Sequence, residues 1–400
     1  MRRNELDIVL NTMLSTRKDV SDLNFTVDKS LQVESNGELV PVPFGLVNEA
    51  LTPYQSEMIA LNLLGGSRRL IESLLRSGSS DSSYSLSDQA RFRVNIFSQR
   101  SQYSIVMRKL NTRIPSIPEL LLPDIFYQIA HEKTGLILIT GATGSGKTTT
   151  LAALLNYIND SKSVHVITLE DPVEFVHPQK KATFNHRELG IDFDSFANGL
   201  RAALRQAPKV ILVGEMRDRD TVSIGLSAAE TGHLVLSTLH TIDAGQTINR
   251  ILGMFDQEEQ KQVRLRLSDT LRWVISQRLA PVIGGGRRAV LEIMGANLRT
   301  QESIQLGESE GKGFYEIIEA SKTFGWRTFD QSCIDLFEQG LITEDTALLY
   351  CSKKGVVTRA IDILKKTRGE IATSVTKLGM KPEQTGSAQV RVAPTLKLKP

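Results

Sequence analysis

The residues from Gly141 to Thr149 have the types and the spacing that bind a phosphate group. The segment reads Gly141-Ala142-Thr143-Gly144-Ser145-Gly146-Lys147-Thr148-Thr149. Its glycines let the backbone turn so that several N–H groups point at one anion, and a helix starting near Thr148 adds a favourable dipole. The ammonium of Lys147 can neutralise β- and γ-phosphate charge, and the hydroxyl of Thr148 can bind Mg²⁺. The segment therefore predicts binding of ATP or GTP together with Mg²⁺.

Carboxylates follow two short apolar runs and could take part in nucleotide hydrolysis. The runs are expected to be buried strands of one sheet: Val166–Leu169 and Val210–Val213. Glu170 and Asp171 follow the first run, and Gly214 and Glu215 follow the second. Ligands of open α/β sheets collect at the carboxyl ends of the strands, where a carboxylate can hold Mg²⁺ or activate water.

The two runs differ in the role that their carboxylates can take. Gly214 stands where a phosphate-loop protein usually has an Asp that binds the metal. We therefore expect metal contact to pass through water, with Glu170 as a candidate for that contact. Glu215 is the better candidate for activating the attacking water. The alternative that these carboxylates only cap strand ends stays open.

Two histidines flank the apolar run from Leu234 to Leu239. They are His233 and His240, and neither lies in a Cys or carboxylate pattern typical of a metal site. A lone histidine is usually structural. For an imidazole at the strand end we favour a hydrogen bond to phosphate or to a catalytic carboxylate, and His240 is the candidate.

These residues need a parallel sheet to bring them together, and the sequence after Gly135 has the pattern of one. Short apolar runs alternate with segments of helical character: Leu136–Ile139, Val164–Leu169, Val210–Val213 and Leu234–Ser237. Continuous apolar strands suit a parallel sheet covered on both faces. We predict an α/β domain over 124–370 with a helical C-terminal part, after a proline-containing linker over 113–123. The tail 371–400 is predicted to be disordered.

Residues 1–112 predict a smaller α+β domain. Apolar residues at helical spacing indicate an opening helix over about 5–16, and Asn36–Gly37 has the sequence of a hairpin turn. Alternation at Arg91–Phe97 and Tyr103–Met107 predicts strands. The serine-rich run Ser77–Ser87 is expected to be a flexible loop.

The composition excludes several classes of protein. The 400 residues are 40% hydrophobic and 23% charged, which excludes a wholly disordered chain. Subtracting 45 acidic from 48 basic residues leaves a charge of +3, too small to imply nucleic acid. Two cysteines exclude a disulfide framework and a four-cysteine zinc site. With neither a signal segment nor a run of about 20 apolar residues, a cytoplasmic protein without membrane insertion is expected.

Four of these segments together resemble the type II/type IV secretion ATPases, and within that family the pilus retraction (PilT-like) branch. The four segments, in chain order, are Gly141–Thr148, Thr168–Phe175, Val210–Asp218 and Thr231–Thr241. Other matching segments lie outside them: Ser21–Leu23, Asn36–Leu39, Arg91–Asn95 and Thr328–Ser332. The resemblance covers roughly residues 5–365.

The resemblance implies a fold, an assembly and a set of site residues. It implies a RecA-like phosphate-loop ATPase core, a PAS-like N-terminal domain and a homohexameric ring with ATP between the two domains. Arg93 and Arg108 match by position the arginines that reach the γ-phosphate, and Arg217 and Arg278 are further candidates. Surface or salt-bridge roles remain equally open for each. Implied partners are an inner-membrane pilus platform protein, which would place the chain peripherally at that membrane, and a paralogous pilus ATPase.

Two departures from the family pattern keep other functions open. Ala207-Pro208-Lys209 stands where the family often has Asp-Pro-Asp, and Glu308–Gly313 does not match the retraction motif expected near Leu298–Glu319. A PilU-like accessory ATPase or an assembly ATPase is therefore an alternative to retraction. From other classes, a RecA-like nucleic-acid translocase and a non-hydrolysing nucleotide-regulated scaffold remain, the latter only if Glu215 is inert.

Overall fold

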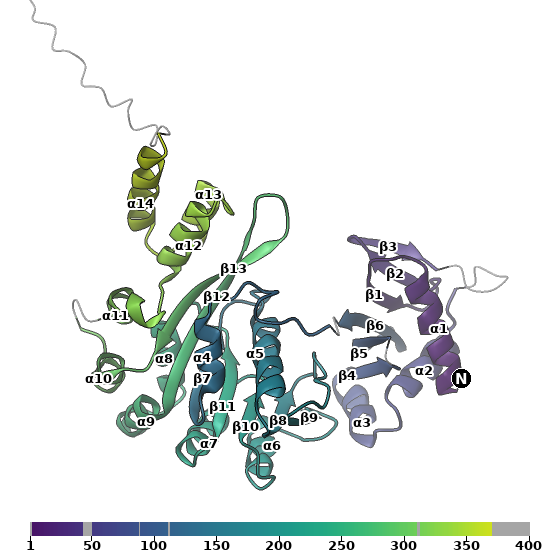
Figure 1. Cartoon of the computed structure of the whole chain (residues 1–400). Helices are drawn as coiled ribbons and strands as arrows, with labels where there is room; N and C mark the ends of the chain where they lie inside the picture. The colour runs from purple at the N-terminus through teal and green to yellow at the C-terminus, as the bar shows by residue number, and fades with distance from the viewer. Residues whose placement is uncertain (1, 43–49, 88, 111–112, 310–312, 370–400) are drawn as a thin grey trace, which may run out of the picture.

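The computed structural model describes residues 2–42, 50–87, 89–110, 113–309 and 313–369. Its strands form two separate sheets, and the helices pack around each of them (Figure 1). The tail predicted to be disordered, 371–400, lies outside the described residues, as do positions 310–312 within Glu308–Gly313.

The larger sheet is the predicted parallel sheet, with strand order β13-β12-β7-β11-β10-β8-β9. All neighbouring strands are parallel except β12 and β13, which pair antiparallel. The strands are β7 Gly135–Thr140, β8 His165–Glu170, β9 Thr183–Glu188, β10 Val210–Val213, β11 Leu234–Leu239, β12 Leu271–Pro281 and β13 Arg287–Gly295. The mixed α/β core expected from the apolar runs is confirmed.

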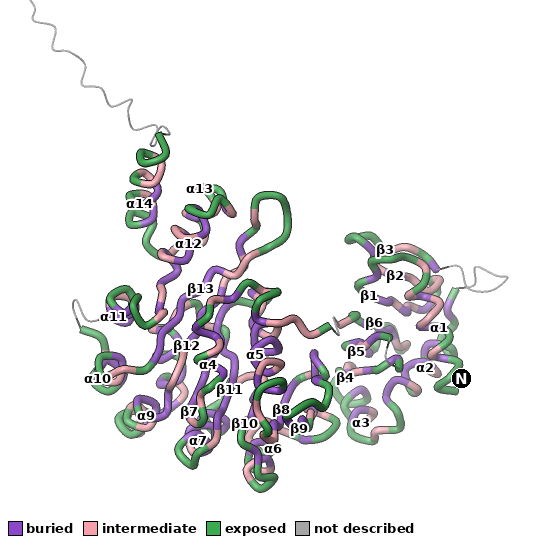
Figure 2. The backbone as a smooth tube through the Cα atoms, viewed as in Figure 1, coloured by how far each residue is buried: buried purple, intermediate pink, exposed green. Residues whose placement is uncertain are grey.

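Helices cover both faces of the larger sheet, which explains why its central strands are continuously apolar. On β7, Leu136 and Leu138 pack into one cluster, whereas Ile137 and Ile139 pack into the cluster on the opposite face. Figure 2 shows the strands of this sheet coloured mostly as buried. The helices of this part are α4 Ile125–His131, α5 Lys147–Ser161, α6 Phe196–Ala203, α7 Arg219–Glu230, α8 Ala244–Leu252, α9 Gln257–Thr270, α10 Leu298–Leu306 and α11 Phe314–Ala320.

The C-terminal helices pack on the antiparallel end of the larger sheet. They are η1 Lys322–Phe324, α12 Phe329–Glu338, α13 Glu344–Tyr350 and α14 Lys354–Thr367. Phe329 and Cys333 of α12 form a buried cluster with Ala280 of β12 and Val290 of β13. This region is helical, as the sequence predicted.

The N-terminal residues form an antiparallel sheet with order β3-β2-β1-β6-β5-β4. Its elements are α1 Arg3–Ser15, β1 Val20–Phe25, β2 Gln32–Ser35, β3 Glu38–Pro41, α2 Pro53–Leu63, α3 Arg68–Ser77, β4 Ser79–Leu86, β5 Ala90–Gln99 and β6 Gln102–Leu110. On β5, Phe92, Val94 and Ile96 are buried against the helices, while Arg91 and Arg93 alternate with them on the other face. The predicted opening helix and the Asn36–Gly37 hairpin are confirmed.

The serine-rich run is a strand, so the prediction of a flexible loop there was wrong. Residues Ser79–Leu86 pair along their length with β5 as β4, and they alternate in burial. Ser80, Ser82 and Tyr84 are buried with Leu86. Pairing with β5 satisfies the backbone of this strand, while the buried hydroxyls of Ser80 and Ser82 have no hydrogen-bond partner among the described residues.

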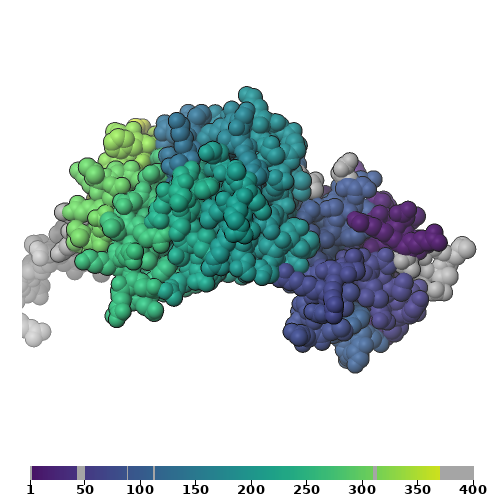
Figure 3. All heavy atoms as spheres, turned by 90° about the horizontal axis from the view of Figure 1, so that it is seen from below, coloured from purple at the N-terminus to yellow at the C-terminus, as the bar shows by residue number. Residues whose placement is uncertain are grey.

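Residues 113–123 connect the two sheets. Ile117 and Leu122 of this segment are buried in the cluster that packs on α4 and α5. Seen from below, the N-terminal residues form a lobe beside the larger one (Figure 3). Among the described residues, no helix is both long and apolar enough to cross a membrane.

Candidate nucleotide-binding site

A cavity of about 560 Å³ lies at the carboxyl ends of β8 and β10, beside the N-terminal sheet. Its polar and charged lining comes from six places in the sequence. They are the loop that leads into α5, the ends of β8, β10 and β11 with the residues that follow each of them, β5 of the N-terminal sheet, and the start of β13. The charged and histidine side chains that line it are Arg93, Lys147, Glu170, Asp171, Glu174, His177, Glu215, Arg217, His240 and Arg287.

The loop before α5 has a conformation that only glycine allows at two positions. Gly141 has φ of 144° and Gly146 has φ of 88°. A Cβ added at Gly141 would lie 2.3 Å from the backbone oxygen of Gln277, and one at Gly146 would lie 2.8 Å from Gln277 Nε2. Gln277 of β12 also donates to Ser145 O at 2.6 Å and accepts from Thr150 Oγ1 at 2.9 Å. The neighbouring strand thus fixes the loop from behind, a contact that the sequence did not suggest.

The polar groups of the loop are arranged for an anion. Lys147 Nζ donates to the backbone oxygens of Gly141 at 2.8 Å and Ala142 at 3.0 Å. Burial lowers the pKa of Lys147, and the carboxylates of Glu215 and Glu174 oppose that effect. Ser145 Oγ is buried and has no hydrogen-bond partner among the described residues. The other loop residues that line the cavity are Thr143, Gly144, Thr148 and Thr149.

Glu215 lies where the sequence predicted, directly beyond β10, and it has two basic neighbours. Arg217 Nε is 2.5 Å from Glu215 Oε2, and His240 Nε2 is 3.7 Å from the same oxygen. Burial, and next the charge of Lys147, lower the pKa of His240. The imidazole of His240 therefore lies just beyond the end of β11, beside the Glu215 carboxylate.

Glu170 ends β8 and is buried beside a histidine that the sequence did not single out. His186 Nδ1 lies 3.6 Å from Glu170 Oε1 and 2.9 Å from Thr168 Oγ1. The backbone N–H of His177 donates to His186 Nε2 at 3.0 Å, so in the neutral ring the proton is on Nδ1. His186 therefore fixes the surroundings of Glu170 and the chain that follows it.

Two further carboxylates line the cavity next to Glu170. Burial raises the pKa of Asp171 and also that of Glu174, whose carboxylate hydrogen-bonds to Thr148 and so opposes the rise. The sequence named Asp171 together with Glu170 but gave Glu174 no role. Its position in the acidic segment after the strand was the available signal.

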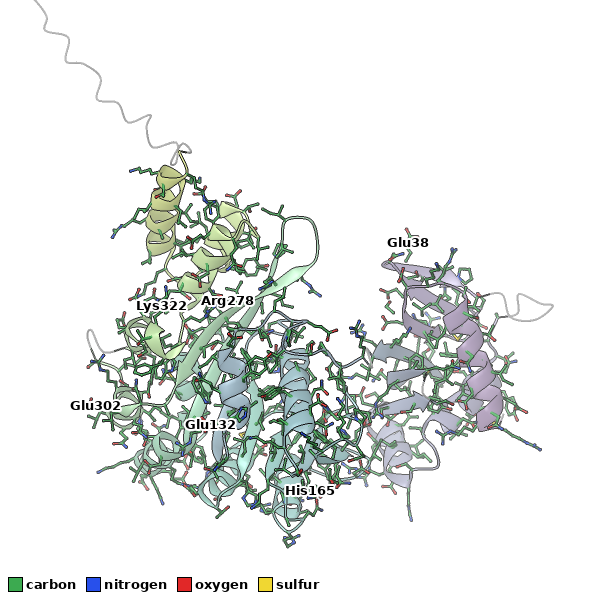
Figure 4. The ribbon with its side chains drawn as sticks, in the orientation of Figure 1. Glu38, Glu132, His165, Arg278, Glu302 and Lys322 are labelled. Carbon is green, nitrogen blue, oxygen red and sulfur yellow. The ribbon has the colours of Figure 1, made fainter. Side chains whose placement is uncertain are left out.

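The structure separates the four candidate arginines. Arg93 and Arg217 line the cavity. Arg108 is the cross-strand neighbour of Arg93, but it lies outside the cavity lining and its Nε is 2.9 Å from Asp22 Oδ1. Arg278 donates to Tyr350 O at 2.7 Å and lies 3.8 Å from the centre of the Phe329 ring. It sits beside the C-terminal helices, away from the N-terminal sheet (Figure 4).

His233 is also far from the cavity, because it precedes β11 at the opposite end of the strand. Its Nδ1 is 3.0 Å from Ala228 O, a contact that fixes the turn after α7. The structural interpretation of a lone histidine fits this position.

Known proteins share both the sequence and the fold. The sequence model of the family described as type II/IV secretion system protein matches residues 82–322. The twitching motility protein of Neisseria gonorrhoeae is 46% identical over 268 residues, which cover 67% of this chain and 71% of that protein. The type IV pilus ATPase PilU of Pseudomonas aeruginosa is 34% identical over 365 residues, which cover 91% of this chain and 94% of the relative.

A solved structure of the pilus retraction motor PilT with bound ADP matches this fold. Its TM-score is 0.77 at 39% identity, and the match covers 88% of this chain and 98% of the PilT chain. The resemblance drawn from the four sequence segments is confirmed, and so is the prediction that the chain binds a nucleotide. The chain belongs to the type II/IV secretion system protein family, the family of the secretion and pilus ATPases.

Proposed function

We propose that this chain is an ATP-hydrolysing motor that drives retraction of type IV pili, and thereby twitching motility. The observation that carries the proposal is the composition of the cavity. A phosphate-binding loop, two strand-end carboxylates and an arginine from a second sheet line one space. The names of the relatives, a twitching motility protein and a retraction motor, support the direction of the motor.

ATP fits the residues of the loop. The glycine cradle leaves no room for a Cβ at Gly141, and Ser145 Oγ is a buried hydroxyl without a partner among the described residues. Residues Gly141–Thr149 would bind the phosphates through backbone N–H groups, as helix N-termini do in such loops. Lys147 would exchange its two backbone acceptors for phosphate oxygens.

Mg²⁺ fits the same cavity only together with the nucleotide. In the described part of the chain, no group of three or more His, Cys, Asp or Glu side chains could hold a metal ion. The Thr148 hydroxyl, and Glu170 through water, would complete a coordination shell that phosphate oxygens begin. When bound, Mg²⁺ would neutralise phosphate charge.

The carboxylates and basic groups of the cavity would each have a different role in ATP hydrolysis. Glu215 would orient the attacking water and accept its proton, and His240 would hold that carboxylate in place. Arg93 would stabilise the charge that develops on the transferred phosphoryl group, which a planar guanidinium suits. Arg108 is less suited to this role because Asp22 holds its guanidinium at 2.9 Å.

The position of the cavity beside both sheets would turn hydrolysis into motion. Loss of the γ-phosphate would remove the anion that Arg93 faces, so the two lobes could separate. In a homohexamer such openings would alternate around the ring and act on a platform protein of the inner membrane. The chain would then work in the cytoplasm, at the membrane surface, without entering the bilayer.

A PilU-like accessory function is the second candidate. It is favoured by the alignment with PilU, which extends over 91% of this chain. An accessory ATPase would act beside a paralogous pilus ATPase, so its loss would weaken retraction under load rather than abolish it.

Deletion of the gene in its own host, with plasmid-borne complementation, tests the proposal. Surplus surface pili and loss of twitching, restored by the wild-type gene but not by Glu215→Gln, are expected for a retraction motor. Twitching that persists in the deletion strain would favour the accessory function, and cells without pili would favour assembly. Stimulation of the purified ATPase by single-stranded DNA would instead support a translocase.

A further inference from the structure

A buried ion pair joins the N-terminal sheet to the larger lobe. Arg91 Nη2 on β5 lies 2.6 Å from Glu188 Oε2 at the end of β9, and the two side chains are 16% and 5% exposed. Most ion pairs on the surface contribute little, whereas a buried pair with satisfied hydrogen bonds fixes its geometry. Nothing in the proposed chemistry uses Arg91 or Glu188 directly.

One oxygen of Glu188 collects donors from both lobes. Besides Arg91, Ser83 Oγ of β4 donates to Glu188 Oε2 at 2.9 Å. The backbone N–H of Val173 donates to the same oxygen at 3.2 Å. Val173 lies between the cavity-lining residues Pro172 and Glu174. The carboxylate therefore ties two strands of the N-terminal sheet to the wall of the nucleotide cavity.

The guanidinium of Arg91 completes this connection from the other side. Its Nε donates to Val173 O at 2.9 Å, and its Nη1 donates to Ser85 Oγ at 3.1 Å. The backbone N–H of Val173 thus binds Glu188, and its carbonyl oxygen binds Arg91. The planar arginine fork serves several acceptors at once, which a lysine ammonium would do with less defined geometry.

Arg91 and Arg93 share one face of β5, because alternate residues of a strand point the same way. Two residues of strand separate their Cα atoms by roughly 7 Å. Arg93 lines the cavity, and within the described chain its guanidinium makes no hydrogen bond or ion pair to another residue. The position of Arg93 at the cavity therefore depends on where β5 is held. Asn95 and Arg108, its other neighbours on this face, bind within the N-terminal lobe, whereas Arg91 binds Glu188 and Val173 of the larger lobe.

We propose that Arg91 and Glu188 are positioning residues that hold Arg93 at the nucleotide cavity. The inference rests on the proposed role of Arg93 in ATP hydrolysis. Arg91 and Glu188 bind no nucleotide in this scheme. They set the distance of Arg93 from the phosphoryl group by fixing β5 against the chain segment that carries Glu174.

Steady-state and ADP-binding measurements on the full-length assembled protein test this role. Arg91→Ala and Glu188→Gln should each lower kcat by roughly 10–100-fold, the cost of a misplaced catalytic group. ADP affinity should stay within about threefold of wild type, because the phosphate-binding loop is untouched. Arg68→Ala removes an exposed arginine of α3, paired with Glu72, and serves as the matched control with unchanged kcat.

The double variant Arg91→Ala/Arg93→Ala separates positioning from a general structural role. If Arg91 acts only through Arg93, the double variant turns over as fast as Arg93→Ala alone. A further loss in the double variant, or a loss of ADP affinity with the loss of kcat, would overturn the inference. If Arg91→Ala does not fold, Arg91→Lys and Glu188→Gln in the Arg93→Ala background make the same comparison.

The variant Lys147→Ala separates a failure of the positioning role from a failure of the proposed ATP site. Turnover that survives in Lys147→Ala would refute the proposed ATP site, and with it the role of Arg93. Turnover lost in Lys147→Ala but normal in Arg91→Ala and Glu188→Gln would overturn the positioning role alone.

Discussion

In the larger sheet, parallel strands are buried on both faces, and the groups that can do chemistry lie beyond the strand ends. In the N-terminal sheet, β5 buries one face against helices and points arginines outward from the other. A covered parallel sheet has only its ends free for polar groups, so Glu170 and Glu215 come together at one edge. An open antiparallel face can instead place a cation at alternate positions along a strand.

Each sheet has its own apolar core, whereas polar groups make the contacts between the two lobes. Arg69 of α3 donates to Phe193 O and Asp194 O, and Arg91 and Ser83 bind Glu188. Polar contacts between domains separate more readily than a shared apolar core. Under the proposed function, the larger lobe would carry the rigid half of the site and the smaller lobe, held by these polar contacts, the movable half.

The largest expected effect comes from the rigid half. Lys147→Ala should abolish productive ATP binding, because the loop then keeps only its backbone donors for the phosphates. Nucleotide titration and phosphate release on the purified protein measure this. Near-normal turnover would show that the catalytic site lies elsewhere.

Glu215→Gln should have the next largest effect, since it keeps the shape of the side chain but removes the base. We expect kcat to fall by ~10²–10⁴-fold while ATP still binds. Single-turnover hydrolysis and ATP affinity, measured on one preparation, separate chemistry from binding. Tight binding with wild-type chemistry would exclude Glu215 as the base.

Arg93→Ala tests the movable half, with Arg108→Ala as its cross-strand comparison. Loss of one group that stabilises the transition state should lower kcat by roughly 10²–10³-fold with little change in affinity. Arg108→Ala should change kcat much less, because that side chain pairs with Asp22 and is 71% exposed. Equal losses in both variants would contradict this distinction between neighbours.

Glu292 gives the smallest expected effect, on stability in the rigid half. It is buried on β13, accepts from the Ala244 N–H at 2.9 Å, and burial raises its pKa to about 7. A carboxyl whose pKa is raised by folding costs no stability below its unfolded value of about 4.5. The cost then grows as the pH rises through 7, to roughly 3 kcal/mol.

Glu292→Gln should therefore melt at a higher temperature than wild type at pH 8. The difference should shrink as the pH falls towards 5, because wild-type Glu292 then becomes neutral. Thermal melts of both proteins across this range provide the measurement. A difference in melting temperature that is independent of pH would mean that Glu292 is not the titrating group.

The difference between the two sheets also explains which strands could be predicted from the sequence. The central strands were recognisable because burial on both faces makes them continuously apolar. β9, Thr183–Glu188, was missed because it is an edge strand with the polar sequence TFNHRE. β4 was missed because serine fills positions where a β-branched or aromatic residue would have indicated a strand.

The sequence alone determined the family, the phosphate-binding loop and the carboxylates beyond β8 and β10. These depend on consecutive residues, whose local backbone and strand ends follow from residue type and spacing. Only the tertiary structure decided that Arg93, not Arg108 or Arg278, lines the cavity, and that Glu188 meets Arg91 across 97 positions. Strand order and the face that each side chain takes bring such residues together, and neither is encoded in nearby sequence.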